Sequence, residues 1–213
     1  MAILTNGIMG GFSGTVGTVV GSNWRGKDYI RARAVYRKSR PFSPKQVDHQ
    51  LKFKLVSRFT HSLQSLLLIT YGHHAVQQTA RNSAVAYLLQ EAVTGSSPHF
   101  ELDYSKVLIS RGTLLGAKDA SVRAGLDAAI DFRWRANAGA GGARDDDRAI
   151  LVAYCPTLQK SCYAITTATR NSGIASLIAE ELSGHTVHAW LAFISEDGQR
   201  IANIVYAGAL VVD

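Results

Sequence analysis

The sequence predicts an α+β protein with three parts in chain order: a glycine-rich arm with a β-hairpin, a two-helix segment, and a seven-stranded antiparallel β-sandwich of the fibronectin or immunoglobulin type. Three observations predict this order. Six glycines lie between residues 7 and 21, apolar residues recur at four-residue steps after Pro44, and short alternating runs with turn signals fill the rest. We therefore expect two domains: residues 1–98 with the arm, a basic hairpin and the helical pair, and residues 99–213 with the sandwich.

Residues 1–14 are expected to form a flexible arm, because glycine loses more backbone entropy on ordering than any other residue. The glycines assigned to this flexible region are Gly7, Gly10, Gly11, Gly14, Gly17 and Gly21. The β-branched run 15–21 and the alternating run 28–36 predict a hairpin with residues 22–27 as its loop. In the second strand, Tyr29, Arg31 and Arg33 share one face, and Ile30 and Ala32 share the other.

Two helices are expected next. Ser43 followed by Pro44 is a helix start signal, with serine as the cap and proline at the first helical position. Apolar residues from Val47 to Leu63 recur every four residues, which predicts one helix from residue 44 to about residue 70. A second helix is expected over about residues 75–93, and the segment 94–98 ends it with glycine and proline.

The remaining sequence predicts short strands separated by turns. The expected strands are residues 104–110, 125–135, 149–154, 161–168, 174–179, 186–194 and 201–212. Trp134 and Trp190 alternate with apolar residues in two of these strands, so both are expected in the core. Cys155 and Cys162 lie on the two arms of one predicted hairpin and are interpreted as reduced packing residues; whether they lie close together is left open.

Charge is unevenly distributed along the chain. Residues 1–58 contain eleven Lys and Arg and two acids, a net charge of +9, whereas the remaining 155 residues contain twelve bases and fourteen acids, a net charge of −2. Such asymmetry is typical of an end that meets an anionic polymer or another protein copy. The candidate interaction residues are Trp24, Arg25, Lys27, Tyr29, Arg31, Arg33, Arg37, Lys38 and Arg40.

One interpretation of this basic region is that it binds nucleic acid, and two alternatives to that interpretation remain. It is a solvated basic face, or it forms ion pairs with an acidic patch such as residues 145–147 of another copy. By itself the acidic run 145–147 is interpreted as a solvated turn, because it lacks the spaced oxygen ligands of a calcium loop.

The sequence indicates no catalytic, metal or cofactor site. Gly21–Lys27 has the spacing of a phosphate-binding loop, but Asp28 and a strand follow where serine or threonine and a helix are needed. The histidines are not spaced as metal ligands. No serine or cysteine lies in a sequence context that indicates a Ser/His/Asp or Cys/His catalytic arrangement. The start has no secretory signal, and the apolar run 66–69 is far too short to cross a bilayer, so a cytoplasmic protein, or part of a particle assembled there, is expected without a membrane partner.

Several motifs resemble a known family. They include Gly10–Gly17, Trp24–Gly26, Asp103–Gly112, Phe193–Gly198 and Tyr206–Gly208. Through these motifs the chain resembles an uncharacterised family of proteins of about this length from Bacteroidota, a domain of unknown function. The resemblance implies a glycine-rich start and a fibronectin-like end, and it implies no catalytic residue.

These observations favour a non-enzymatic structural or interaction protein that assembles with copies of itself into a filament, tube or shell. The arm and the open edges of the hairpin offer backbone groups with which another subunit can pair. The alternative is a nucleic-acid-binding protein that uses the basic hairpin. A third hypothesis, a carbohydrate or small-ligand module on the sandwich loops, rests on fold analogy alone.

Overall fold

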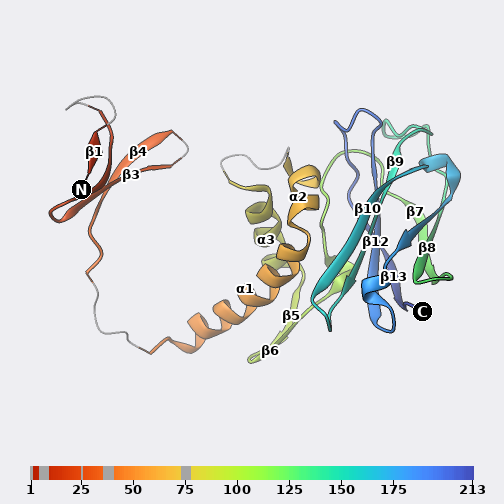
Figure 1. Ribbon diagram of the computed structural model, residues 1–213, viewed down its shortest axis with the longest axis horizontal. Coiled ribbons are helices and arrows are strands. Elements are labelled where there is room, and N and C mark those ends of the chain that lie inside the picture. Colours follow the sequence, from red (N-terminus) through yellow and green to blue (C-terminus); the bar gives the residue numbers. More distant parts are fainter. Residues whose placement is uncertain (1, 5–9, 25, 36–40, 73–77) are drawn as a thin grey trace. The chain divides into compact units, whose positions relative to one another are not determined.

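The computed structural model describes residues 2–4, 10–24, 26–35, 41–72 and 78–213. The chain divides into two compact units, Met1–Ser43 and Pro44–Asp213 (Figure 1). We call them the N-terminal unit and the C-terminal unit.

The N-terminal unit is a four-stranded antiparallel sheet whose strands are neighbours in chain order. The strands are β1 (Ile3–Leu4), β2 (Phe12–Val16), β3 (Val19–Trp24) and β4 (Lys27–Ala32). The predicted arm is therefore partly a strand, because residues 12–14 belong to β2. The predicted loop 22–27 is also too long, since Trp24 pairs directly with Lys27.

Three helices open the C-terminal unit: α1 (Pro44–Ser62), α2 (Gln64–Thr70) and α3 (Ala80–Glu91). Helix α1 starts at the predicted proline. The single helix predicted to residue 70 is broken at Leu63, which has φ −108° and ψ 14°. Leu63 is fully buried, so the apolar spacing continues across the break and hides it in the sequence. Helix α3 begins after Thr79, whose side chain accepts a hydrogen bond from the Asn82 amide at 3.1 Å.

The segment after α3 differs from the prediction in two places. Strands β5 (Val93–Ser96) and β6 (His99–Leu102) form a hairpin where only a turn was expected. The predicted strand 104–110 begins instead as the short 3₁₀ helix η2 (Tyr104–Lys106). The Asp103 carboxylate accepts hydrogen bonds from the Ser105 amide and hydroxyl, at 3.1 and 2.5 Å, and this local cap favours a turn over an extended strand.

Two antiparallel sheets form the rest of the unit. One contains β10 (Lys160–Thr169), β9 (Arg148–Cys155), β12 (Thr186–Ile194) and β13 (Val205–Val211) in that spatial order; the other contains β11 (Ile174–Ile178), β8 (Ala129–Arg135) and β7 (Lys118–Ala124). The 3₁₀ helices η3 (Arg170–Ser172) and η4 (Glu180–Leu182) lie in the connections. Strand β7 was not predicted, and the last predicted strand is shorter, starting at Val205.

The two central strands of the four-stranded sheet, β9 and β12, are buried on both faces. Along β9, Ile150, Val152 and Tyr154 pack with Phe59 and Leu63 of the helical segment in one hydrophobic cluster. The alternate residues Ala149, Leu151, Ala153 and Cys155 pack with Phe132 of β8 and Leu177 of β11 in a second cluster. Strand β12 divides in the same way, with Trp190 on the helix side and Phe193 on the side of the other sheet. The unit therefore has three layers: helices, sheet and sheet.

This layering moves the predicted boundary. The sequence placed the helical pair with the basic hairpin and separated it from the sandwich at residue 98. In the structure the compact units divide between Ser43 and Pro44, and the helices pack on the four-stranded sheet. The physical reason is that β9 and β12 present apolar side chains on both faces, so the sheet needs a second covering layer.

A buried ion pair fixes the connection before β9 to the connection after β10. The Arg170 and Asp147 side chains have no exposed surface, and Arg170 Nε donates to Asp147 Oδ2 at 3.0 Å. Arg170 Nη1 and Nη2 donate to Asn137 Oδ1 at 2.7 Å and to the Leu115 carbonyl at 2.9 Å. The guanidinium carbon also lies 3.9 Å from the ring centroid of Phe193. The acidic run 145–147 is thus not wholly a solvated turn, because Asp147 is the partner of Arg170.

Candidate interaction surface

The register of β3 and β4 places all five of the described candidate residues on one side of the N-terminal sheet. Opposite residues share a face, and the pairs are Trp24 with Lys27, Ser22 with Tyr29, and Val20 with Arg31. The Arg33 amide donates to the Thr18 carbonyl at 2.7 Å, which continues the ladder by one residue. We call the side that carries Trp24, Lys27, Tyr29, Arg31 and Arg33 the cationic face.

The cationic face combines positive charge with exposed aromatic rings. Trp24 is 59% exposed and Tyr29 is 45% exposed, and Lys27 and Arg31 are also exposed. The acid of this hairpin, Asp28, lies on the opposite side, where its Oδ1 accepts from Asn23 Nδ2 at 2.7 Å. Arg25, Arg37, Lys38 and Arg40 were also predicted to take part, and they lie outside the described residues.

The other side of the sheet is apolar. Val16 pairs with Val19, Val19 pairs with Ala32, and Ile30 pairs with Gly21, so these side chains share one face, which we call the apolar face. Ile30 is 68% exposed and Val16 is 57% exposed. The sequence analysis placed Ile30 and Ala32 on one strand face but did not treat that face as a site. The alternation of Ile30 and Ala32 with Arg31 and Arg33 was the sequence signal that could have indicated an apolar face opposite the cationic one.

The glycines of the predicted arm have specific positions in this sheet. Gly14 has φ +118°, a value that other residues rarely adopt, and it lies inside β2 opposite Gly21. At Gly21 a Cβ atom would meet the carbonyl oxygen and the ring of Phe12, so β2 lies against this backbone at a contact that only glycine permits. Gly17 is in the turn between β2 and β3, Gly10 and Gly11 precede β2, and Gly7 lies outside the described residues.

The N-terminal sheet has no core of its own. Among its described residues only Gly21 is buried, and none contributes to either hydrophobic cluster. A sheet normally buries one face against another layer. Within residues 2–4, 10–24 and 26–35, Phe12 covers the apolar face only at Gly21, and Val16, Val19 and Ile30 on that face stay exposed.

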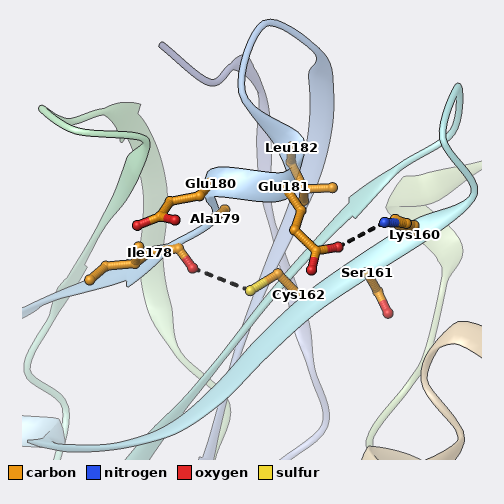
Figure 2. Close-up of a pocket in the computed structure, with 8 residues that line it drawn as sticks. All are labelled: Lys160, Ser161, Cys162, Ile178, Ala179, Glu180, Glu181 and Leu182. Atoms are coloured by element: carbon orange, nitrogen blue, oxygen red, sulfur yellow. Dashed lines mark hydrogen bonds and ion pairs between the residues drawn. The ribbon is translucent and has the colours of Figure 1, made fainter.

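A second candidate site is a hollow of about 320 Å³ in the C-terminal unit (Figure 2). It lies between the start of β10 and residues 178–182. Lys160 Nζ and Glu181 Oε2 form an ion pair at 2.9 Å, which lowers the pKa of Glu181, and both side chains are well exposed. Such exposed pairs contribute little free energy.

Cys162 lines this hollow but does not have the properties of a nucleophile. Its Sγ donates to the Ile178 carbonyl at 3.3 Å, and burial raises the pKa of the thiol, so the thiol stays protonated at neutral pH. Cys155 and Cys162 are both free thiols, and Cys155 pairs with Lys160 across the β9–β10 hairpin. Both contact the second hydrophobic cluster, which agrees with the predicted packing role.

The described residues contain no group of three or more His, Cys, Asp or Glu side chains that could hold a metal ion. Within the described part of the chain, no helix combines the length and the apolar composition that a bilayer crossing requires.

Comparison with known proteins shows the family. The chain belongs to DUF6266, a family of unknown function, whose model matches residues 11–208. Among solved structures it is similar to the fn3 domain of the human collagen alpha-1(XX) chain, with 10% sequence identity and a TM-score of 0.33, over 56% of this chain and 90% of that chain. The comparison with curated proteins gave no match.

Proposed function

We propose that this protein is a non-enzymatic structural subunit that assembles with copies of itself through its N-terminal unit. The observation that supports this most directly is a folded sheet without an interior. Ile30, Val16 and Val19 are 68%, 57% and 36% exposed and lie side by side on the apolar face. Burying such a face in a second layer contributes about 25 cal/mol per Å² of apolar surface.

A second copy of the chain is the occupant that the chemistry of the apolar face fits. Two identical apolar faces cover each other in one step, and sheets pack face to face at about 10 Å. In the described residues Asp28 is the one charged side chain on that side, and its hydrogen bond to Asn23 lies at the far end of the hairpin from Val16 and Val19. The outer edge of β4 offers a further route, because an unpaired strand edge is a template for another strand.

The experiment is a comparison of molar masses by light scattering. Val19→Asp with Ile30→Asp introduces two charges into the apolar face, and Val20→Asp with Tyr29→Asp introduces the same charges into the opposite face of the same two strands. We expect the first pair to reduce the assembly to a monomer and the second pair to leave the mass unchanged. Equal masses for all three proteins at micromolar concentration would contradict the proposal.

A second candidate function, nucleic-acid binding, is favoured by the cationic face. Its three described cations, Lys27, Arg31 and Arg33, lie beside Trp24 and Tyr29 on a side without an acid among its described residues. Neutralising three phosphates predicts a log–log salt slope of about −2.7 on duplex DNA. Arg31→Glu with Arg33→Glu tests this function: loss of retention on nucleic acid with unchanged particle mass supports it, and no binding of the unaltered protein at low salt contradicts it.

We also propose that the C-terminal unit is a fibronectin-like sandwich. The strand orders of the two sheets in the C-terminal unit, four strands and three, support a fibronectin-like sandwich. A cytoplasmic location, or a place in a particle assembled there, and an origin in Bacteroidota stay predictions.

A further inference from the structure

A second basic surface lies on the C-terminal unit, on the exposed side of α1. Lys54, Arg58 and His61 are spaced by four and three residues, so they follow one stripe of the helix. Val56, Phe59 and Leu63 face the core on the opposite side. Successive members of the stripe are about 4.5–6 Å apart along the helix axis.

Helix α3 adds a fixed guanidinium beside this stripe. Helices α1 and α3 lie side by side (Figure 1). Arg81 Nη2 donates to the carbonyl and to the hydroxyl of Ser57, at 3.0 and 2.8 Å, and Nε lies 3.4 Å from Thr60 Oγ1. These bonds occupy one edge of the guanidinium and leave the Nη1 donors without an acceptor among the described residues. Because the side chain is already ordered, binding an anion there has a smaller entropic cost.

These groups line a shallow hollow of about 490 Å³ that is open to solvent. Its lining is Phe53, Lys54, Ser57, Arg58, His61 and Arg81. The lining contains no acid, and within the described residues no carboxylate lies within ion-pair distance of Lys54, Arg58 or Arg81. The Phe53 ring is 50% exposed at the rim. Arg58 also lines two neighbouring hollows, one towards Tyr104 and one towards Lys160, where Glu181 pairs with Lys160, so the cations without a carboxylate partner are those of the first hollow.

We propose that this hollow binds single-stranded nucleic acid, with a phosphate on Arg58, Arg81 and Lys54 and a base against Phe53. Uncompensated cations spaced along a groove meet a phosphate backbone, and an exposed aromatic ring accepts a base of any sequence. An acidic peptide would satisfy the cations but would not use the ring. The site does not depend on the N-terminal sheet and does not rest on the proposed assembly.

Binding of a labelled single-stranded oligonucleotide to the full-length protein, followed by fluorescence anisotropy at several salt concentrations, tests the site. Lys54→Glu with Arg58→Glu reverses two charges in the hollow. Lys118→Glu with Arg123→Glu makes the same change in net charge on the exposed strand β7. We expect the first pair to weaken binding at least tenfold and to make the salt slope shallower by about 1.4, and the second pair to have much less effect. Equal losses for the two pairs would overturn the site.

Two further arms separate the class of ligand. Phe53→Ala leaves the charge unchanged and is expected to weaken binding about fivefold or more, whereas an unchanged affinity overturns the role of the ring and with it the nucleic-acid assignment. Polyglutamate of equal charge is expected to compete poorly; equal competition would assign the hollow to acidic protein segments instead. The oligonucleotide affinity of Arg31→Glu with Arg33→Glu, measured in parallel, shows whether the cationic face contributes to binding. The proposal for the hollow and the proposal for the cationic face can therefore fail independently. Circular dichroism controls the fold of each variant.

Discussion

The two units of this chain use β-sheets in opposite ways. In the C-terminal unit, β9 and β12 are buried on both faces, between three helices and a second sheet. In the N-terminal unit, the sheet of β1–β4 has a single buried residue among those described. Val16, Val19 and Ile30 are exposed on one side, and the cations are exposed on the other with Trp24 and Tyr29. The comparison shows that apolar content does not by itself make a core. A core also needs a second layer, which the C-terminal unit supplies itself and which we propose that a second copy supplies for the N-terminal unit.

The largest effect is expected at the buried ion pair. Arg170→Ala leaves Asp147 buried without its partner and removes the contact with Phe193, so we expect the free energy of unfolding to fall by about 3–5 kcal/mol or more. Urea denaturation followed by tryptophan fluorescence measures it. Lys160→Ala, which breaks the exposed pair with Glu181, is the matched control and should cost less than about 1 kcal/mol. Similar losses of unfolding free energy for both variants would show that burial of the ion pair does not determine its contribution to stability.

The next effect tests whether the helices and the sheets are one cooperative unit. Phe59 of α1 lies with its ring centroid 4.8 Å from that of Tyr154 and 6.1 Å from that of Trp190. We expect Phe59→Ala to lower the free energy of unfolding of the whole C-terminal unit by about 3–5 kcal/mol. Fluorescence and far-ultraviolet circular dichroism should then report one shared transition. Separate transitions for helix and sheet would restore the boundary near residue 98.

A smaller effect is expected at the start of α3. Thr79→Ala removes the side chain that accepts from the Asn82 amide, and loss of such a cap costs about 1 kcal/mol. Thr79→Ser keeps the hydroxyl and is the control. If thermal unfolding shows the same midpoint for the alanine and serine variants, the cap does not contribute to stability.

The smallest effect on folding is expected in the N-terminal unit. Ile30→Thr keeps a β-branched side chain on β4 and removes apolar surface from a position outside both clusters. At a protein concentration low enough for monomers, we expect the unfolding free energy of the C-terminal unit to change by less than about 0.5 kcal/mol. At higher concentration the same variant should weaken assembly. A large change in the dilute monomer would indicate that Ile30 packs within its own chain.

The sequence predicted the features that depend on local signals. Ser43 and Pro44 located the start of α1, and alternation predicted that Trp134 and Trp190 are buried, as they are at 6% and 0% exposure. Alternation also placed Tyr29, Arg31 and Arg33 on one face. The register then added Trp24 and Lys27 to that face, which required knowledge of the pairing between β3 and β4.

Other features depended on contacts between distant residues. The burial of Asp147 depends on Arg170, 23 residues further along the chain, and no local pattern indicates it. The break at Leu63 is hidden because the apolar spacing continues through it. The position of the helices against the sheet did have a signal: residues 149–155 and 189–194 are almost continuously apolar, which is typical of strands covered on both faces.

The double burial of β9 restricts how the chain can change in length. Because successive residues of β9 alternate between the two hydrophobic clusters, an inserted residue would send every following side chain to the opposite layer. Bulky groups such as Tyr154 would then meet the space shaped for Ala153, and the reverse would hold on the helix side. Insertions and deletions are therefore expected to be tolerated in connections such as residues 138–142 and to prevent folding in the central strands. A fusion partner or tag placed within this protein belongs at that connection.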